Sequence, residues 1–167
     1  WYQAVAAFHL NHNYGHTMWS SATSKYASSG TPRSYVGSET TEGYSGEWIQ
    51  INLKKKAKIY YYGVAIPKSH SVLRQPYDWR IYGSNNGTNW TQVDEQQGRD
   101  WESWWTNWSE KPSSLTSKSI YSIPQKVQYI ELSQPSTYQY FRMVINKLEN
   151  SDNKVQLGFL GFYGVWD

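Results

Sequence analysis

The most regular feature of the sequence is the alternation of apolar and polar positions within short stretches. In DWRIYGS, residues 78–84, Trp79 and Ile81 share one face of an extended chain while Arg80 and Tyr82 share the other. A period of two residues is typical of a β-strand that buries one face. Strand character recurs at 47–53, 58–66, 78–84, 89–95, 118–124, 127–133, 138–148 and 158–166. No stretch as long as an ordinary helix has a period of 3.6 residues, so the pattern predicts an all-β, antiparallel β-sandwich.

The connections between these strands are of two kinds. Residues 54–58 (KKKAK) and 85–89 (NNGTN, with an Asn-Gly hairpin signal) are short. If consecutive strands are antiparallel, both short connections lie at one end of the sandwich. The long connections, 23–46, 67–77 and the one beginning near Asp94, then gather at the opposite end, which we call the mouth. Functional loops on a rigid sandwich commonly cluster in this way.

Composition favours strands and turns over helices and limits the classes of function. The chain of 167 residues predicts a single domain, 1–167, and 17% of the residues are aromatic, with 15 Tyr and 10 Trp. There is no cysteine, which excludes disulfides and thiolate metal sites. The net charge of +3 is too small to indicate a nucleic-acid partner. No run approaches the roughly 18 apolar residues of a membrane span.

Two further expectations come from the basic residues and from the first residue. The densest basic run is Lys54, Lys55, Lys56 and Lys58. We interpret this run as the solvated tip of a hairpin. The chain begins at Trp1 with no initiator methionine and no signal-peptide pattern, so we expect a processed product or a segment of a larger protein.

The sequence carries no motif of a known catalytic site. It has no HExxH, no GxSxG and no phosphate-binding glycine loop. Asp78 and Asp94 flank mouth loops, but nothing marks them as a matched acid and base. We therefore predict that the protein is not an enzyme.

Five short motifs occur in one order along nearly the whole chain. They are AAFHLNHNYGHTMWSS (6–21), WIQINL (48–53), GSNNGTNW (83–90), YFRM (140–143) and GFYG (161–164). In this order the chain resembles the discoidin family, also called the coagulation factor five/eight type C domain, whose fold is shared with many galactose-binding carbohydrate modules. The resemblance implies an eight-stranded jelly roll whose mouth loops bind glycans, phospholipid head groups or proteins. Since one fold serves several functions, the function has to be argued from the loops.

The resemblance directs attention to the segment RQPYDW. Galactose-binding relatives carry an arginine in this loop, followed by an asparagine, and both bond sugar hydroxyls. Arg74 matches the arginine, and its planar fork suits two neighbouring oxygens. Gln75 or Asp78 could replace the asparagine, and His70 could replace a sugar-binding histidine of the relatives. We also assign Tyr77 to the ligand site. The alternative is that Arg74 is a surface residue paired with Asp78.

Four tryptophans lie close together in RDWESWWTNWSE, residues 99–110. They are Trp101, Trp104, Trp105 and Trp108. Their spacing would place them on one face of a short helix near 100–109. The face could pack on the sandwich as a plug, or present one or two indoles to a ligand, and we assign all four to the candidate site. The tryptophans on strand or motif positions are expected in the core: Trp19, Trp48, Trp79 and Trp90.

Metal binding is not expected. His9, His12 and His16 lie in a loop-like segment without a nearby carboxylate, so we interpret them as structural or incidental. Many discoidin relatives hold calcium with an aspartate and a glutamate, and the matching positions here are His9 and Phe159. Because calcium prefers hard oxygen ligands, we predict no family-type calcium site and no cofactor.

The sequence therefore predicts a non-catalytic carbohydrate-binding module at an extracellular, cell or particle surface, serving attachment or adhesion. Aromatic rings would stack on the sugar while Arg74 and loop amides bond its hydroxyls. The first alternative is a protein-interaction module that uses an aromatic mouth. The second alternative, which we rank below the first, is binding of phospholipid head groups. It needs protruding apolar side chains that are surrounded by basic residues.

Overall fold

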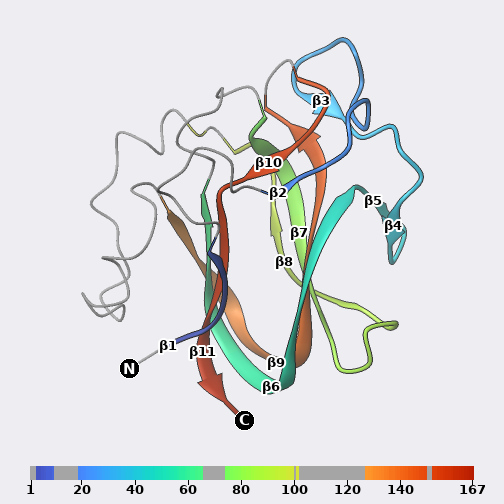
Figure 1. The fold of residues 1–167 in the computed structure, drawn as a ribbon. Helices are drawn as coiled ribbons and strands as arrows, with labels where there is room; N and C mark the ends of the chain where they lie inside the picture. Colours follow the sequence, from blue (N-terminus) through green and yellow to red (C-terminus); the bar gives the residue numbers. More distant parts are fainter. Residues whose placement is uncertain (1–2, 10–18, 66–73, 100, 102–126, 150–151) are drawn as a thin grey trace.

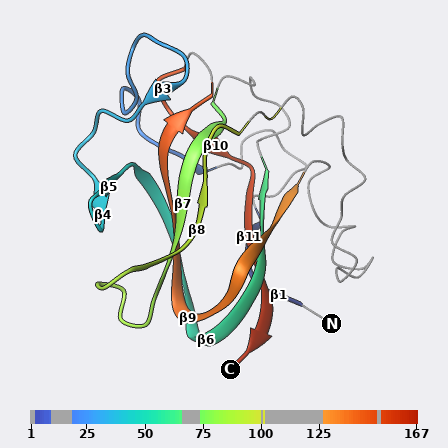
Figure 2. The ribbon, with the colours of Figure 1, turned by 180° about the vertical axis from the view of Figure 1, so that it is seen from behind.

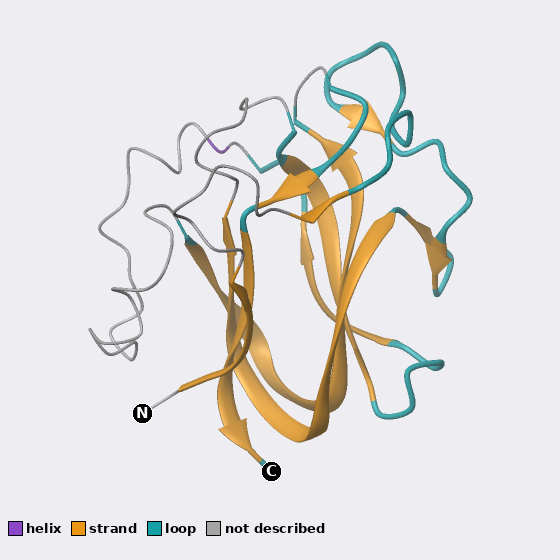
Figure 3. Cartoon of the chain, in the orientation of Figure 1, coloured by secondary structure: helices purple, strands orange, loops and turns teal. Residues whose placement is uncertain are grey.

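The computed structural model describes residues 3–9, 19–65, 74–99, 101, 127–149 and 152–167, and for residues 3–9 it describes the backbone alone. The strands are β1 (Gln3–His9), β2 (Trp19–Ser20), β3 (Arg33–Ser34), β4 (Thr40–Thr41), β5 (Tyr44–Ser45), β6 (Glu47–Ala65), β7 (Pro76–Ser84), β8 (Thr91–Gln96), β9 (Gln128–Leu148), β10 (Gln156–Leu157) and β11 (Phe159–Trp166). This part of the chain is almost entirely strand and loop (Figure 3). It includes no helix that is long and apolar enough to cross a membrane.

One continuous antiparallel sheet forms both layers of the sandwich. Its strand order is β1-β11-β6-β9-β7-β8, with β3 added beside β9. The long strands β6 and β9 pair with each other and curve together at one end of the molecule (Figures 1 and 2). On one side of the curve β9 pairs with β7, which pairs with β8. On the other side β6 pairs with β11, which pairs with β1.

The curve corrects the predicted connection at 54–58. We expected 47–53 and 58–66 to be neighbouring strands of a hairpin, but they are the two halves of β6 and both pair with β9. Pairing is interrupted between Asn52 and Ala57, and Lys54 has a φ of 69°, so the chain bends there instead of reversing. The segment KKKAK has no glycine or asparagine for a two-residue hairpin turn, which explains the bend.

For the described residues the predicted arrangement of the two ends still holds, because a bend into the opposite layer returns the chain toward the same end as a hairpin would. The bend of β6 and the β7–β8 hairpin lie at one end, and the start of β7, the end of β8 and β10 lie at the other (Figure 1). The predicted strands at 127–133 and 138–148 are likewise two halves of β9. The predicted strand at 118–124 and most of the predicted helix near 100–109 lie outside the described residues.

The core fills the space between the two layers. Alternate residues of the central strands supply it, as expected from the period of two. Its largest fully buried side chains include Trp79, Tyr62, Phe141, Phe162, Ile81 and Met143. The Tyr62 hydroxyl accepts a hydrogen bond from Trp79 Nε1 at 3.0 Å and donates to Asp94 Oδ2 at 2.6 Å. The buried Tyr62 hydroxyl therefore has both a donor and an acceptor as partners. These bonds replace the water contacts that it loses on burial.

Trp79 confirms the prediction of a core tryptophan, Trp19 packs partly against the core, and Trp90 is half-buried. The prediction for Trp48 is wrong, since 37% of this residue is exposed. In β6 the inward positions belong to Ile49 and its alternate neighbours, so Trp48 points out of the sandwich.

The outward tryptophans enclose an arginine. The Arg142 guanidinium lies 4.2 Å from the centre of the Trp48 ring and 4.1 Å from that of Trp90. Its Nε and Nη2 donate to Gln50 Oε1 at 3.2 and 2.8 Å, and its Nη1 donates to Thr41 Oγ1 at 2.8 Å. The motifs at 48–53, 83–90 and 140–143 therefore meet in one stack on the outer face of the sheet. Cation–π contact and hydrogen bonding explain why a half-exposed arginine occupies this position.

Candidate ligand-binding site at the mouth

Two chain segments form the described part of the mouth. One is 74–77, which leads into β7, and the other is 152–156, which leads into β10. Gln156 N donates to the Arg74 carbonyl at 3.1 Å, and Glu149 N donates to the Gln75 carbonyl at 3.0 Å. Backbone hydrogen bonds therefore hold the segment of Arg74 between the end of β9 and β10, so its position is fixed by the sheet.

Two side-chain hydrogen bonds orient the Arg74 guanidinium in the mouth. Its Nε donates to Asp152 Oδ2 at 2.6 Å, and its Nη1 donates to Gln156 Oε1 at 3.0 Å. The Arg74 and Asp152 side chains are 24% and 18% exposed. Although burial opposes ionisation of Asp152, hydrogen bonds from Arg74 and Asn153 hold the pKa of this carboxyl below its usual value. Asp152 is therefore ionised at neutral pH, and its bond to Arg74 fixes both side chains in place.

The Arg74 guanidinium retains N–H groups that can donate hydrogen bonds to a ligand. A guanidinium has five N–H donors, and within the described chain Arg74 uses one on Nε and one on Nη1. The N–H groups of Nη2 have no hydrogen-bond partner in that part of the structure. A pre-oriented pair of donors of this kind suits neighbouring oxygens on a ligand.

The alternative pairing of Arg74 with Asp78 is wrong. Asp78 instead lies 2.8 Å from Lys147 Nζ and accepts from Gly98 N at 2.9 Å. Gln75 is only 3% exposed, so the structure places it inside the fold and not on the face that a ligand could reach. Tyr77 is half-buried at the edge of the mouth, and its carbonyl accepts from Arg99 N at 3.1 Å.

Trp101 packs into the core and does not face a ligand, which corrects its assignment to the ligand site. The residue is fully buried, and its ring lies 6.2 Å from that of Trp79 with an angle of 33° between the planes. Its Nε1 donates to the Pro76 carbonyl at 2.6 Å. The loop that follows β8 therefore begins by closing the core beneath the mouth. The other predicted ligand contacts lie outside the described residues: His70, Trp104, Trp105 and Trp108.

Sequence reasoning missed Asp152 and Gln156. Both residues lie in the segment ENSDNKVQ, 149–156, which carries no recognised motif. Asp152 was a usable signal, because a ligand-binding arginine needs an acceptor that holds its guanidinium in place. The sequence separation of 78 residues between Arg74 and Asp152 hid this pairing from local patterns.

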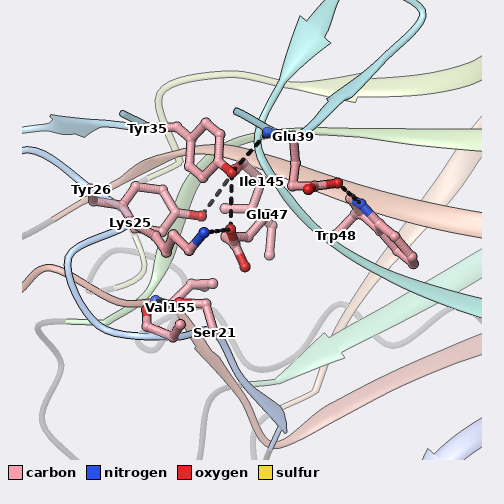
Figure 4. Close-up of polar contacts among 10 residues, drawn as sticks. Ser21, Lys25, Tyr26, Tyr35, Glu39, Glu47, Trp48, Ile145 and Val155 are labelled. Atoms are coloured by element: carbon pink, nitrogen blue, oxygen red, sulfur yellow. Dashed lines mark hydrogen bonds and ion pairs between the residues drawn. The ribbon is translucent and has the colours of Figure 1, made fainter. Parts of the chain in front are cut away.

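A network of tyrosines and carboxylates holds the long segment 23–46 against the start of β6 (Figure 4). The Tyr35 hydroxyl donates to Glu47 Oε1 at 3.0 Å and accepts from Glu39 N at 3.2 Å. The Tyr26 hydroxyl donates to the Ile145 carbonyl at 3.0 Å. The segment is therefore an ordered part of the scaffold beside the mouth.

This network gives a prediction for alkaline pH. Burial, together with the bond to Glu47, raises the pKa of the Tyr35 phenol from 10.0 to about 12. A raised folded-state pKa stabilises the fold fully below the unfolded value, and the contribution is lost as the pH rises through the folded value. We therefore expect the free energy of unfolding to decrease between pH 10 and pH 12, measured by denaturant titration. The decrease should be shallower in Tyr35→Phe, and an identical slope in the variant would contradict the assignment.

Metal ligation finds no support among the described side chains, where no group of three His, Asp or Glu residues is arranged to hold an ion. The positions that match the calcium ligands of discoidin relatives are direct register partners, since His9 of β1 lies opposite Phe159 of β11. Phe159 is fully buried among apolar neighbours. The absence of a family-type calcium site stays a prediction.

Comparison with known proteins defines the class of fold. No family model matches the sequence, and no curated protein matches it. The structure is similar to a family 32 carbohydrate-binding module from a family 31 glycoside hydrolase of Clostridium perfringens, with 16% identity, a TM-score of 0.55, and coverage of 98% of this chain and 90% of that one. It is also similar to the family 32 module of EndoD from Streptococcus pneumoniae, with 13% identity, a TM-score of 0.52, and coverage of 91% and 78%.

A third similar structure is chitosan-binding module 1 from a chitosanase/glucanase of Paenibacillus sp. IK-5, with 17% identity, a TM-score of 0.50, and coverage of 91% and 79%. These likenesses extend over nearly the whole chain and confirm the predicted fold, an antiparallel jelly-roll sandwich of the discoidin-like type. At such low identity they establish the fold, and the function has to come from the site.

Proposed function

We propose that the protein is a non-catalytic carbohydrate-binding module whose mouth binds a glycan. The observation that carries this proposal is the Arg74 fork, which Asp152 and Gln156 orient while the Nη2 donors stay available. The similar solved structures named as carbohydrate-binding or chitosan-binding modules support the same class of ligand.

The chemistry of the site fits neighbouring sugar hydroxyls. Each hydroxyl offers lone pairs to a guanidinium N–H, and the planar fork selects two oxygens at a fixed spacing. Asp152 Oδ1 is already bonded to Asn153 N at 2.7 Å, so this carboxylate mainly orients the arginine. We propose that Tyr77, His70 and the three remaining tryptophans of the 99–110 segment supply stacking and further polar contacts. Those tryptophans are Trp104, Trp105 and Trp108.

A binding role is proposed in place of catalysis because two acids of the described part of the mouth, Asp78 and Asp94, are occupied by structural partners. Asp78 pairs with Lys147, and Asp94 accepts from Tyr62 and from Gln96 Nε2 at 2.8 Å. Hydrolysis of a glycoside needs two carboxyl groups free to act on one bond. We further propose that the module belongs to a larger protein and attaches it to glycans at an extracellular, cell or particle surface, with no cofactor.

Arg74→Ala is expected to weaken glycan binding by about 10- to 100-fold, the effect of losing charge-assisted hydrogen bonds to a ligand. A glycan array would first identify the sugar, and calorimetry on that sugar would measure the change. Arg74→Lys should also bind weakly, because an ammonium lacks the planar fork.

The matched control is Arg80→Ala. Arg80 forms a similar ion pair, with its Nε 2.9 Å from Glu95 Oε1, but it lies on the outer face of the sheet. This variant should bind the sugar normally. Undiminished binding by Arg74→Ala would reject the site. If the array shows no glycan while the mouth captures a protein or a phospholipid vesicle, the two alternative functions replace the proposal.

A further inference from the structure

Four lysines gather at the end of the sandwich opposite the mouth. Lys54, Lys55, Lys56 and Lys58 occupy the bend of β6, and all four are exposed. We call this group the lysine corner. Asn52 Oδ1 accepts from Lys54 N at 2.8 Å, and this bond supports the left-handed conformation of Lys54 at the bend. No ion pair joins any of the four ammonium groups to a carboxylate in the described part of the chain.

The end of β11 lies beside the lysine corner and adds aromatic and apolar surface. Trp166 is the register partner of Ala57, and Val165 is that of Lys58. These two residues are 44% and 41% exposed. Lys55 Nζ lies 4.8 Å from the centre of the Trp166 ring, and Lys58 Nζ lies 5.6 Å from that of Tyr60. An exposed indole and several cations therefore share one surface.

The neighbouring connections at this end add hydroxyl and amide groups, and Asp167, whose backbone N donates to the Lys56 carbonyl at 3.1 Å, adds one side-chain carboxylate. The bend of β9, 133–137, reads SQPST, and the β7–β8 hairpin, 85–89, reads NNGTN. The lysine corner carries more positive charge than the net +3 of the whole chain, so the rest of the molecule is slightly acidic. The four lysines lie at the bend of β6, and this bend is at the end opposite the mouth (Figure 1). The interpretation drawn from sequence, a solvated tip of a hairpin, does not account for the exposed indole beside the lysines.

We propose that the lysine corner is a second binding site, for an anionic polysaccharide that carries carboxylate or sulfate groups. The ammonium groups bind the anionic substituents, the Trp166 ring stacks on the apolar face of a sugar, and the amides and hydroxyls of 133–137 bond ring oxygens. A lipid surface fits less well, because apolar insertion needs protruding apolar side chains and here the indole is partly covered by Lys55. The site is independent of the glycan site at the mouth.

The proposal predicts binding to immobilised heparin and to hyaluronan at low ionic strength, with no binding to neutral dextran. Lys54→Gln/Lys56→Gln should weaken heparin binding by about 10- to 30-fold, since each lysine near an anionic surface contributes about a factor of five. The slope of log K against log salt should become shallower by about two, one unit for each lysine removed. Lys55 and its contact with Trp166 stay intact in this variant.

Lys25→Gln/Lys154→Gln removes the same charge from outside the lysine corner, leaves the Lys147–Asp78 ion pair intact and should bind heparin normally. Trp166→Ala should weaken binding about two- to tenfold with an unchanged melting temperature. Arg74→Ala should retain heparin binding, which separates this site from the mouth.

Three results would overturn the proposal. The first is a wild-type protein that binds neither heparin nor hyaluronan. The second is an equal loss in the two double-lysine variants, which would indicate diffuse charge. The third is equally strong, lysine-dependent binding to duplex DNA or to phosphatidylcholine vesicles containing phosphatidylserine, because the corner would then recognise charge without recognising sugar.

Discussion

Trp101→Ala is expected to lower the free energy of unfolding by about 3–5 kcal/mol, the usual range for truncating a fully buried tryptophan. The variant removes the ring that packs against Trp79 and leaves the Pro76 carbonyl without its donor. Denaturant titration followed by circular dichroism measures the change, so the test does not depend on tryptophan fluorescence.

Trp166→Ala is the matched control for this prediction, because it removes the same side chain from a position that is 44% exposed. It should cost clearly less than Trp101→Ala. A loss below about 1 kcal/mol for Trp101→Ala would contradict its role as a plug.

Arg142→Ala is expected to cost about 2–4 kcal/mol, through the loss of two cation–π contacts and of the hydrogen bonds to Gln50 and Thr41. The arginine joins β6, the β7–β8 hairpin and the β4–β5 segment on one face of the sheet, so its removal loosens all three. Thermal and chemical unfolding of the purified variant measure the effect.

Arg142→Lys tests the geometry of the stack, because it keeps the charge but cannot lie flat between two indoles. It should recover only a small part of the loss. A double-mutant cycle of Arg142→Ala with Trp90→Ala should show a coupling energy of about 1 kcal/mol. Full recovery by lysine, or additive effects in the cycle, would show that charge and not stacking stabilises this face.

Much of the fold could be predicted from the sequence because the period of two residues is a local property. It places Trp79 and Ile81 inward, and the order of five short motifs identifies the jelly roll. The bend of β6 could not be read in the same way. A strand that changes layer and a hairpin both show two apolar stretches separated by polar residues, and only the pairing with β9 distinguishes them.

The sequence could suggest a site residue whose own side chain carries the chemistry. It could not suggest a residue whose role depends on a partner far away in the chain. Arg74 was a candidate because the resemblance to the discoidin family implies an arginine in this loop, but its partners Asp152 and Gln156 are far away in the chain. Trp101 and Trp48 show the same limit. Both are large apolar residues next to polar ones, and the strand register and the closure of the loop decide which one is buried.

The continuous course of β6 and β9 through both layers has a consequence for folding. These strands pair residues 47–64 with 128–145, so the central contacts have a high contact order and closing the intervening chain costs entropy before any contact forms. Neither layer is complete without both strands, and forming either layer brings the remaining halves of β6 and β9 side by side for pairing. The sandwich should therefore lack an intermediate with one folded layer, fold slowly for its size, and unfold as one cooperative unit that includes the mouth and the lysine corner.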